Sequence, residues 1–157
     1  MPQRSIHEWF ALYGESHQDP LNKLIHWICV PTIYFCVIGL LVSIPPQVLP
    51  VIGTSPWAKA IITCVLLGFY LPRSLILMLC MSVWSFGCLW LAQYVQGHAP
   101  WPLWAISLVL FVLAWLGQFY GHHVEGKKPS FLHDLQFLLI GPAWLMGFIL
   151  RRLRIPY

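Results

Sequence analysis

The fold of this chain is decided by residues 57–95, WAKAIITCVLLGFYLPRSLILMLCMSVWSFGCLWLAQYV, an apolar run interrupted by Pro72-Arg73. As one straight helix it would be about 58 Å long, about twice the hydrocarbon thickness of a bilayer. Proline ends or kinks a helix, and arginine avoids the bilayer interior. We therefore divide the run into a short helix at about 57–71 and a full spanning helix at about 74–95.

The composition agrees with a membrane protein. Of the 157 residues, 59% are hydrophobic and only 9% are charged, and the mean hydropathy is +0.71, which excludes an ordinary soluble domain. Further apolar runs, each close to the ~20 residues that a spanning helix needs, occur at 24–44, 101–120 and 130–150. We predict an all-α, polytopic transmembrane helical bundle with about four to five membrane segments.

We expect one integral membrane domain over residues 1–157, with an N-terminal surface helix and motif segment (1–23) before the membrane bundle (24–152). The apolar residues of 5–16 have helical spacing, which predicts a short amphipathic helix lying on the membrane surface. Asp19 is expected to cap a helix whose first residue is Pro20. The first 23 residues lack the apolar core of a cleavable signal peptide.

The net charge limits the classes of binding partner, and the positions of the cysteines indicate their role. The net charge of +4 is small and scattered, so we expect contact with anionic lipid head groups of the bilayer and no nucleic-acid partner. The cysteines lie in apolar segments without a CxxC pair, so we interpret them as buried packing residues: Cys29, Cys36, Cys64, Cys80 and Cys88.

The division at Pro72 determines on which side of the membrane the later segments lie. If both helices between 57 and 95 cross the membrane, residues 121–133 return to the side that holds the N-terminus. Four histidines then share one face of the membrane: His17, His26, His122 and His133. The count of lysines and arginines makes this face cytoplasmic by the positive-inside rule. We expect a multi-pass protein of the inner membrane in a bacterium, or of the endoplasmic reticulum in a eukaryote.

The last apolar run, 130–150, contains Gly141-Pro142 at its centre, which predicts a kink or break. A segment that re-enters at Pro142 would keep the basic tail at 151–154 on the cytoplasmic side. A full crossing would place that tail on the opposite side. Charge bias favours the re-entrant arrangement.

The stretch Gln118–Pro129, QFYGHHVEGKKP, concentrates titratable groups in a chain that has few. Its simplest interpretation is a polar loop at the membrane edge. The alternative is metal binding or proton chemistry, which use histidine and carboxylate side chains. Outside this stretch, His7 is expected to be a solvated surface residue, and Gln96–Pro100 a turn in which His98 is a loop residue.

The candidate ligands are His17, His26, His122 and either His123 or His133. Glu125 is the nearest carboxylate, and imidazole with carboxylate suits iron, zinc or copper. Asn22 lies four residues before His26, and Gln118 four before His122, so each amide shares a helix face with a histidine. These amides are candidates for hydrogen-bonding groups that do not bind the metal themselves but orient the ligand imidazoles.

Two motifs together resemble a known family. They are HQDPLNKLIH from His17 to His26, followed by Val30-Pro31-Thr32-Ile33, and the stretch Gln118–Pro129, followed by Gly141-Pro142. The pattern is similar to the Mpo-like family, the former domain of unknown function 962, which contains the fungal 2-hydroxy fatty acid dioxygenase. The family pattern has one more residue between its Gly-His pair and its basic pair, which shifts the match of Glu125.

The resemblance implies a membrane enzyme of fatty acid α-oxidation that uses Fe(2+). It would convert a 2-hydroxy fatty acid and O2 to the fatty acid one carbon shorter plus CO2. The implied catalytic residues are His17, His26 and His122, and Glu125 is a further candidate through its shifted match. His133 is a candidate metal ligand because it opens the last apolar run on the same side of the membrane. Lys127 and Lys128 would bind the substrate carboxylate. Contact with lipid head groups is the alternative role for these two lysines.

Two other functions compete with this one. The first is a non-enzymatic membrane protein, a small transporter or scaffold, whose histidines move protons or line the interface. The second is a haem-binding bundle with two axial histidines. Iron without a haem absorption band would favour the dioxygenase.

Overall fold

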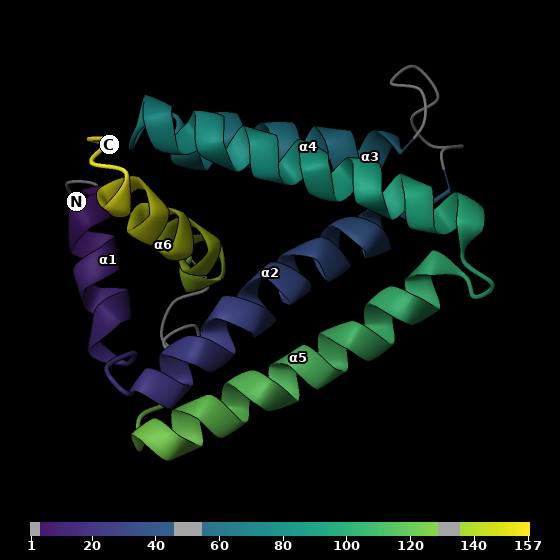
Figure 1. Cartoon of the computed structure of the whole chain (residues 1–157). Helices are drawn as coiled ribbons and strands as arrows, with labels where there is room; N and C mark the ends of the chain where they lie inside the picture. Colours follow the sequence, from purple (N-terminus) through teal and green to yellow (C-terminus); the bar gives the residue numbers. More distant parts are fainter. Residues whose placement is uncertain (1–3, 46–54, 129–135) are drawn as a thin grey trace.

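In a computed structural model, residues 4–45, 55–128 and 136–157 are described, and all regular structure among them is helical. The elements follow each other along the chain as α1 (Ile6–Glu15), α2 (Pro20–Val42), α3 (Pro56–Val65), η3 (Leu66–Tyr70), α4 (Leu75–His98), α5 (Leu103–Glu125) and α6 (Phe137–Arg152). The all-α prediction is therefore confirmed. Figure 1 shows α1 and α6 at one side of the molecule and the long helices α2, α4 and α5 extending away from them.

Helices α2 and α5 form the central pair and have the most extensive contact in the fold. They run antiparallel, and small residues let their backbones approach. A methyl group at Gly39 would overlap Ser107 Oγ, and one at Gly117 would come within 2.9 Å of Cys29 Sγ. Close approach through small residues is how membrane helices gain packing energy without a hydrophobic driving force.

The apolar run at residues 57–95 is divided as predicted. α3 continues into the π-helical turn η3, the chain turns at residues 71–74, and α4 begins at Leu75. Ser74 caps α4 by accepting a hydrogen bond from the backbone N–H of Leu77. Arg73 lies over the ring of Phe69 and donates to its carbonyl, so its charge is held at the turn.

The N-terminal helix is present, but its apolar face is covered by protein. Ser5 and Glu8 form a capping box at its start, and the face made of Ile6, Trp9, Phe10 and Tyr13 is buried. α6 packs on this face. The same spacing suits a helix that docks on a neighbour, and whether α1 also lies on the membrane surface stays a prediction.

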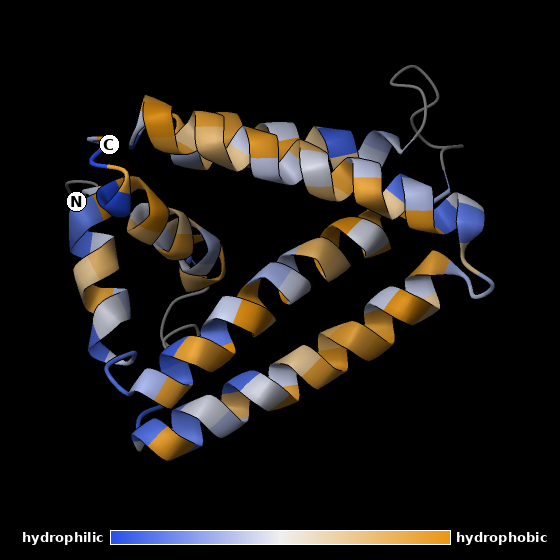
Figure 2. Cartoon of the chain, in the orientation of Figure 1, coloured by the Kyte–Doolittle hydropathy of each residue, from blue (hydrophilic) through white to orange (hydrophobic). Residues whose placement is uncertain are grey.

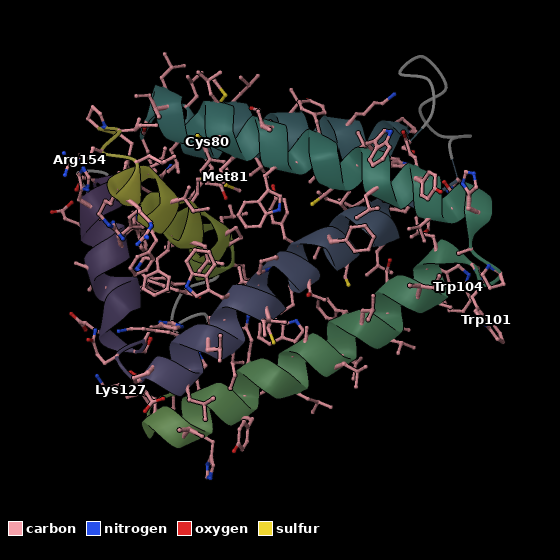
Figure 3. All side chains as sticks on the ribbon, in the orientation of Figure 1. Cys80, Met81, Trp101, Trp104, Lys127 and Arg154 are labelled. Atoms are coloured by element: carbon pink, nitrogen blue, oxygen red, sulfur yellow. The ribbon has the colours of Figure 1, made fainter. Side chains whose placement is uncertain are left out.

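Three of the described helices, α2, α4 and α5, are long and apolar enough to cross a membrane, and the unit α3–η3 is a shorter apolar one. Figure 2 shows that the middle of α5 is hydrophobic, while hydrophilic residues gather where α1, α2 and α5 meet. Figure 3 places Trp101 and Trp104 at the opposite end of α5 from Lys127. Both tryptophans are exposed, as expected of aromatic residues at a membrane interface.

Several helix ends differ from the sequence expectations. α4 continues to His98, so Gln96 to His98 are helical and the turn follows at 99–102. α5 continues to Glu125, so the first two thirds of the polar stretch are helix and not an edge loop. Gly126, with a φ of 71°, ends α5 in the left-handed conformation that favours glycine.

The last helix runs through Pro142 without a break. Its N-terminal part is buried, and neighbouring helices support the backbone there. Whether this segment re-enters the membrane stays a prediction. The cysteines are all free, but only Cys36 is fully buried and Cys64 is exposed, so their interpretation as buried packing residues holds for Cys36 and is wrong for Cys64.

Candidate metal centre

Three histidines from three different segments meet at the end of the central helix pair. His17 lies between α1 and α2, His26 is in the second turn of α2, and His122 is in the last turn of α5. One ligand nitrogen from each lies within 4.8 Å of the other two. The ring centroids are 4.3 Å apart for His17–His26 and 5.0 Å apart for each pair that includes His122. The structure thus brings together these three of the predicted ligands, and the side of the membrane on which they lie stays a prediction.

The connection between α1 and α2 fixes the orientation of His17. Its Nδ1 lies 2.5 Å from the carbonyl oxygen of Tyr13, and its ring stacks on the Tyr13 ring at 4.1 Å. A carbonyl only accepts, so Nδ1 carries the proton and Nε2 presents its lone pair. Burial, reinforced by the neighbouring His26, lowers the pKa of His17 to about 3 and keeps this imidazole neutral.

The first turn of α2 fixes His26 in the same way. Asp19 caps the helix by accepting from the N–H groups of Leu21 and Asn22, and Pro20 is its first residue, as predicted. This start places the carbonyl of Asn22 2.9 Å from His26 Nδ1. Nδ1 is therefore a donor, and the lone pair of Nε2 is left for another partner.

The inner nitrogens of the cluster lack hydrogen-bond partners. His17 Nε2, His26 Nε2 and His122 Nδ1 are all buried with none. Buried polar atoms nearly always have a hydrogen-bond partner. Burying one without a partner costs ~1–3 kcal/mol of folding free energy, so each such atom calls for an explanation. Three neighbouring imidazoles, each with a buried nitrogen that has no hydrogen-bond partner, have the donor set of a metal ion. Among the described residues, no cysteine or carboxylate joins them.

Glu125 lies beside the cluster and holds the segment that carries His17. Its carboxylate accepts from the backbone N–H of Gln18 at 2.6 Å, from that of Asp19 at 3.4 Å and from Asn22 Nδ2 at 2.6 Å. Asn22 Nδ2 also donates to the carbonyl of Ser16 at 3.1 Å. The pair of Glu125 and Asn22 therefore ties the end of α5 to the connection between α1 and α2.

The other predicted site residues lie around this core. Gln118 is buried one turn before His122. Lys127 donates from Nζ to the carbonyl of Glu15 at the end of α1. Lys128 and His123 are exposed. His133 lies outside the described residues.

A cavity of about 300 Å³ adjoins the histidines. His17 and His122 line one end of it, and its walls come from α1, α2, α5 and the start of α6. Most of the lining is apolar: Tyr13, Val30, Ile33, Tyr34, Val37, Phe111, Trp115, Phe137, Leu138, Leu139, Gly141 and Pro142, besides Gln118. A buried cluster of imidazoles at the end of an apolar chamber suits a ligand with a polar head and a hydrocarbon tail.

The family assignment agrees with this geometry. A family model described as 2-hydroxy-palmitic acid dioxygenase Mpo1-like matches residues 3–153. The chain belongs to the Mpo1-like family. The match includes α1, the three clustered histidines and α6, so all elements that build the Mpo1-like site lie inside it. No curated protein and no solved structure matches the chain significantly.

Two residues of the site were missed by the sequence analysis. Tyr13 was assigned only to the apolar face of the first helix, but its carbonyl and ring both contact His17. Trp144 of α6 packs 5.4 Å from the His17 ring and 5.2 Å from the Tyr13 ring. Tyr13 lies four residues before His17, the same spacing that drew attention to Asn22 and Gln118. Nothing in the sequence singles out Trp144 among nine tryptophans.

Proposed function

We propose that this chain is a membrane non-haem Fe(2+) dioxygenase of fatty acid α-oxidation. Its substrates are a 2-hydroxy fatty acid and O2, and its products are the fatty acid one carbon shorter, CO2 and water. The observation that carries the proposal is the set of three orphaned imidazole nitrogens at the end of an apolar cavity. Membership of the Mpo1-like family supports the same reaction.

The donor set fits iron. His17, His26 and His122 would hold the ion through neutral nitrogens, and His133 is a further candidate. Three protein ligands leave coordination positions open, which is the arrangement of catalytic sites and not of structural ones. Iron bound there would supply the redox chemistry that lets O2 react with an organic substrate.

The reaction balances without a reductant. RCH(OH)COOH and O2 contain the same atoms as RCOOH, CO2 and H2O. The bond between the carboxyl carbon and the hydroxylated carbon breaks. These two carbons together lose the four electrons that O2 gains. The substrate is thus its own electron source, and the protein needs no second redox cofactor.

The residues of the chain bind and orient the substrate. The apolar cavity holds the alkyl tail and excludes water from the reacting head. Lys127 and Lys128, at the end of α5, are candidates for attracting the carboxylate. Glu125 and Asn22 keep His17 in place across the interface of α1, α2 and α5. Glu125 also stays a candidate catalytic carboxylate.

The clustered rings disfavour the haem alternative. Axial histidines lie on opposite faces of a haem with the iron between them. The three imidazoles are too close together, with centroids 4.3 to 5.0 Å apart, for a macrocycle to lie between any two of them. A small transporter or scaffold is the second candidate, because buried histidines also serve proton pathways.

Elemental analysis and a product assay test the proposal together. Protein purified in detergent should contain stoichiometric iron without a haem absorption band. Under air, it should release the shortened acid and CO2 from a 2-hydroxy fatty acid and consume one O2 for each. The matched control is the fatty acid without the 2-hydroxyl, which should give no product. Protein that retains iron but forms no product would contradict the proposed reaction, and protein without metal would favour the transporter or scaffold.

A further inference from the structure

The cavity has a measurable length along the helices that build it. On α5 its lining residues extend from His122 to Phe111, and on α2 the last lining residue, Val37, lies as far along the helix from His26. At 1.5 Å per residue, each of these intervals is about 16 Å. The two antiparallel helices therefore give the same distance from the histidines to the far end.

Beyond that end, α2 and α5 close on each other. A methyl group added at Gly39 would overlap Ser107 Oγ and come within 3.5 Å of Leu103. Gly39 lies two residues past Val37, and Ser107 lies one turn past Phe111. The Phe111 ring packs 6.0 Å from the ring of Trp115, another wall residue. Phe111 thus stands between the open cavity and the point where the helices meet.

The chamber is polar at one end only. Its polar groups near the histidines include Gln118 and Tyr13. Further along, the polar groups of the described lining residues are the indole N–H of Trp115 and the Tyr34 hydroxyl. The hydroxyl lies 2.6 Å from Ser85 Oγ, while Ser85 donates to the carbonyl of Met81. The Tyr34 hydroxyl is thus engaged by α4. The far half of the cavity therefore offers mainly hydrocarbon and aromatic surface, which suits an unbranched alkyl chain.

We propose that Phe111 is the stop that sets the chain length of the substrate. The inference rests on the proposed function, because it places the 2-hydroxy acid head at the three histidines. An extended chain advances about 1.2 Å per single bond, so a depth of about 16 Å holds roughly 13 bonds. A longer tail meets the Phe111 ring, and a shorter one leaves apolar wall uncovered.

The proposal is tested with a homologous series of saturated 2-hydroxy fatty acids in two-carbon steps. Binding is measured on the purified protein as displacement of a fluorescent fatty acid, and turnover of the same series is measured separately. The wild-type protein should show an optimum in both. Phe111→Ala should move both optima to longer chains by roughly four carbons, since it frees about one helical turn toward Ser107. Phe111→Leu, which is gentler on packing, should shift them less.

Phe86→Ala is the matched control. Phe86 is exposed on α4 and does not line the cavity, so the same change there should leave both optima where they are. If the Phe111→Ala protein is folded and contains iron but keeps the same chain-length optimum, Phe111 does not limit the length of the substrate. A wild-type protein that binds the series with a length optimum but forms no product refutes the proposed reaction and leaves the stop standing.

Discussion

The side-chain amide of Asn22 lies against the backbone of Gly121, so that a methyl group at position 121 would overlap Asn22 Oδ1. Asn22 has little freedom to move away. Its Nδ2 is held by the carbonyl of Ser16 and by the carboxylate of Glu125. The glycine next to His122 thus lets α5 approach the start of α2 closely enough for the histidines to meet.

Gly121→Ala should therefore separate the two helices at the site. We expect it to lower the free energy of unfolding by about 1–3 kcal/mol, as overpacking does, and to lower the bound iron because His122 moves. Thermal unfolding in detergent and elemental analysis measure the two effects. Gly87→Ala is the control, since Gly87 in α4 has nothing within 4 Å of an added methyl group. Alanine there should stabilise the helix by up to about 1 kcal/mol. Equal behaviour of the two variants would contradict the close approach.

The three clustered histidines are expected to act as one site. His17→Ala, His26→Ala and His122→Ala should each lose activity and most of the bound iron, while the helices stay packed. Metal content and circular dichroism measured on the same samples separate these effects. His7→Ala and His98→Ala should behave like the parent, because both side chains are exposed. If His98→Ala loses iron as fully as His122→Ala, the site lies elsewhere.

The amides near the histidines should affect the metal indirectly. Asn22→Ala removes the two hydrogen bonds that hold Glu125 and Ser16, but it keeps the backbone carbonyl that orients His26. Gln118→Ala changes the cavity wall one turn before His122. We expect both variants to weaken iron affinity by ~10–100-fold without unfolding the protein. Titration of the metal-free protein with iron under anaerobic conditions measures this. Unchanged iron affinity in both variants would show that Asn22 and Gln118 serve only in packing.

The buried His17 predicts how the metal-free protein responds to acid. Its pKa is lowered from 6.5 to about 3 in the folded state, so the unfolded chain binds the proton more readily. Stability from this group is therefore complete above pH 6.5 and is lost as the pH falls from 6.5 toward 3. The thermal midpoint of the metal-free protein should decline over this interval. His17→Gln should decline less steeply, and an identical slope would show that His17 is solvated.

The side of the membrane that holds the site is also testable. His123 and His98 are exposed at opposite ends of the bundle, near the ends of α5 and α4. In a background whose five cysteines are replaced by alanine, His123→Cys should react with a membrane-impermeant thiol reagent only from the cytoplasmic side. His98→Cys should react only from the other side. Labelling of both from one side would contradict a membrane crossing by α5.

Local signals in the sequence were sufficient to predict much of the fold. Pro72 marked the division of the longest apolar run, and Asp19-Pro20 marked the start of α2, because turns and caps depend on neighbouring residues. The convergence of His17, His26 and His122 followed from counting crossings. The length of α5 could not be predicted in this way. Polar residues at the end of a helix have the composition of a loop, and the sequence does not show which groups they contact.

The rest of the site depends on tertiary contacts. The spacing of Ile6, Trp9, Phe10 and Tyr13 predicts one apolar face but cannot tell lipid from α6 as its partner. The hydrogen bond from His17 to the carbonyl of Tyr13 likewise depends on how α1 ends. The role of Glu125 as a link between segments more than 100 residues apart needed the fold itself.

The docking of α1 on α6 has a consequence for biosynthesis. Tyr13 and His17 are synthesised well before Trp144, which packs on both. Until α6 is in place, the aromatic wall behind His17 is missing and its ring lacks one of the surfaces that hold it. The surroundings of His17 are therefore completed only after α6 has been translated, so the proposed iron would enter a bundle whose helices have already been made.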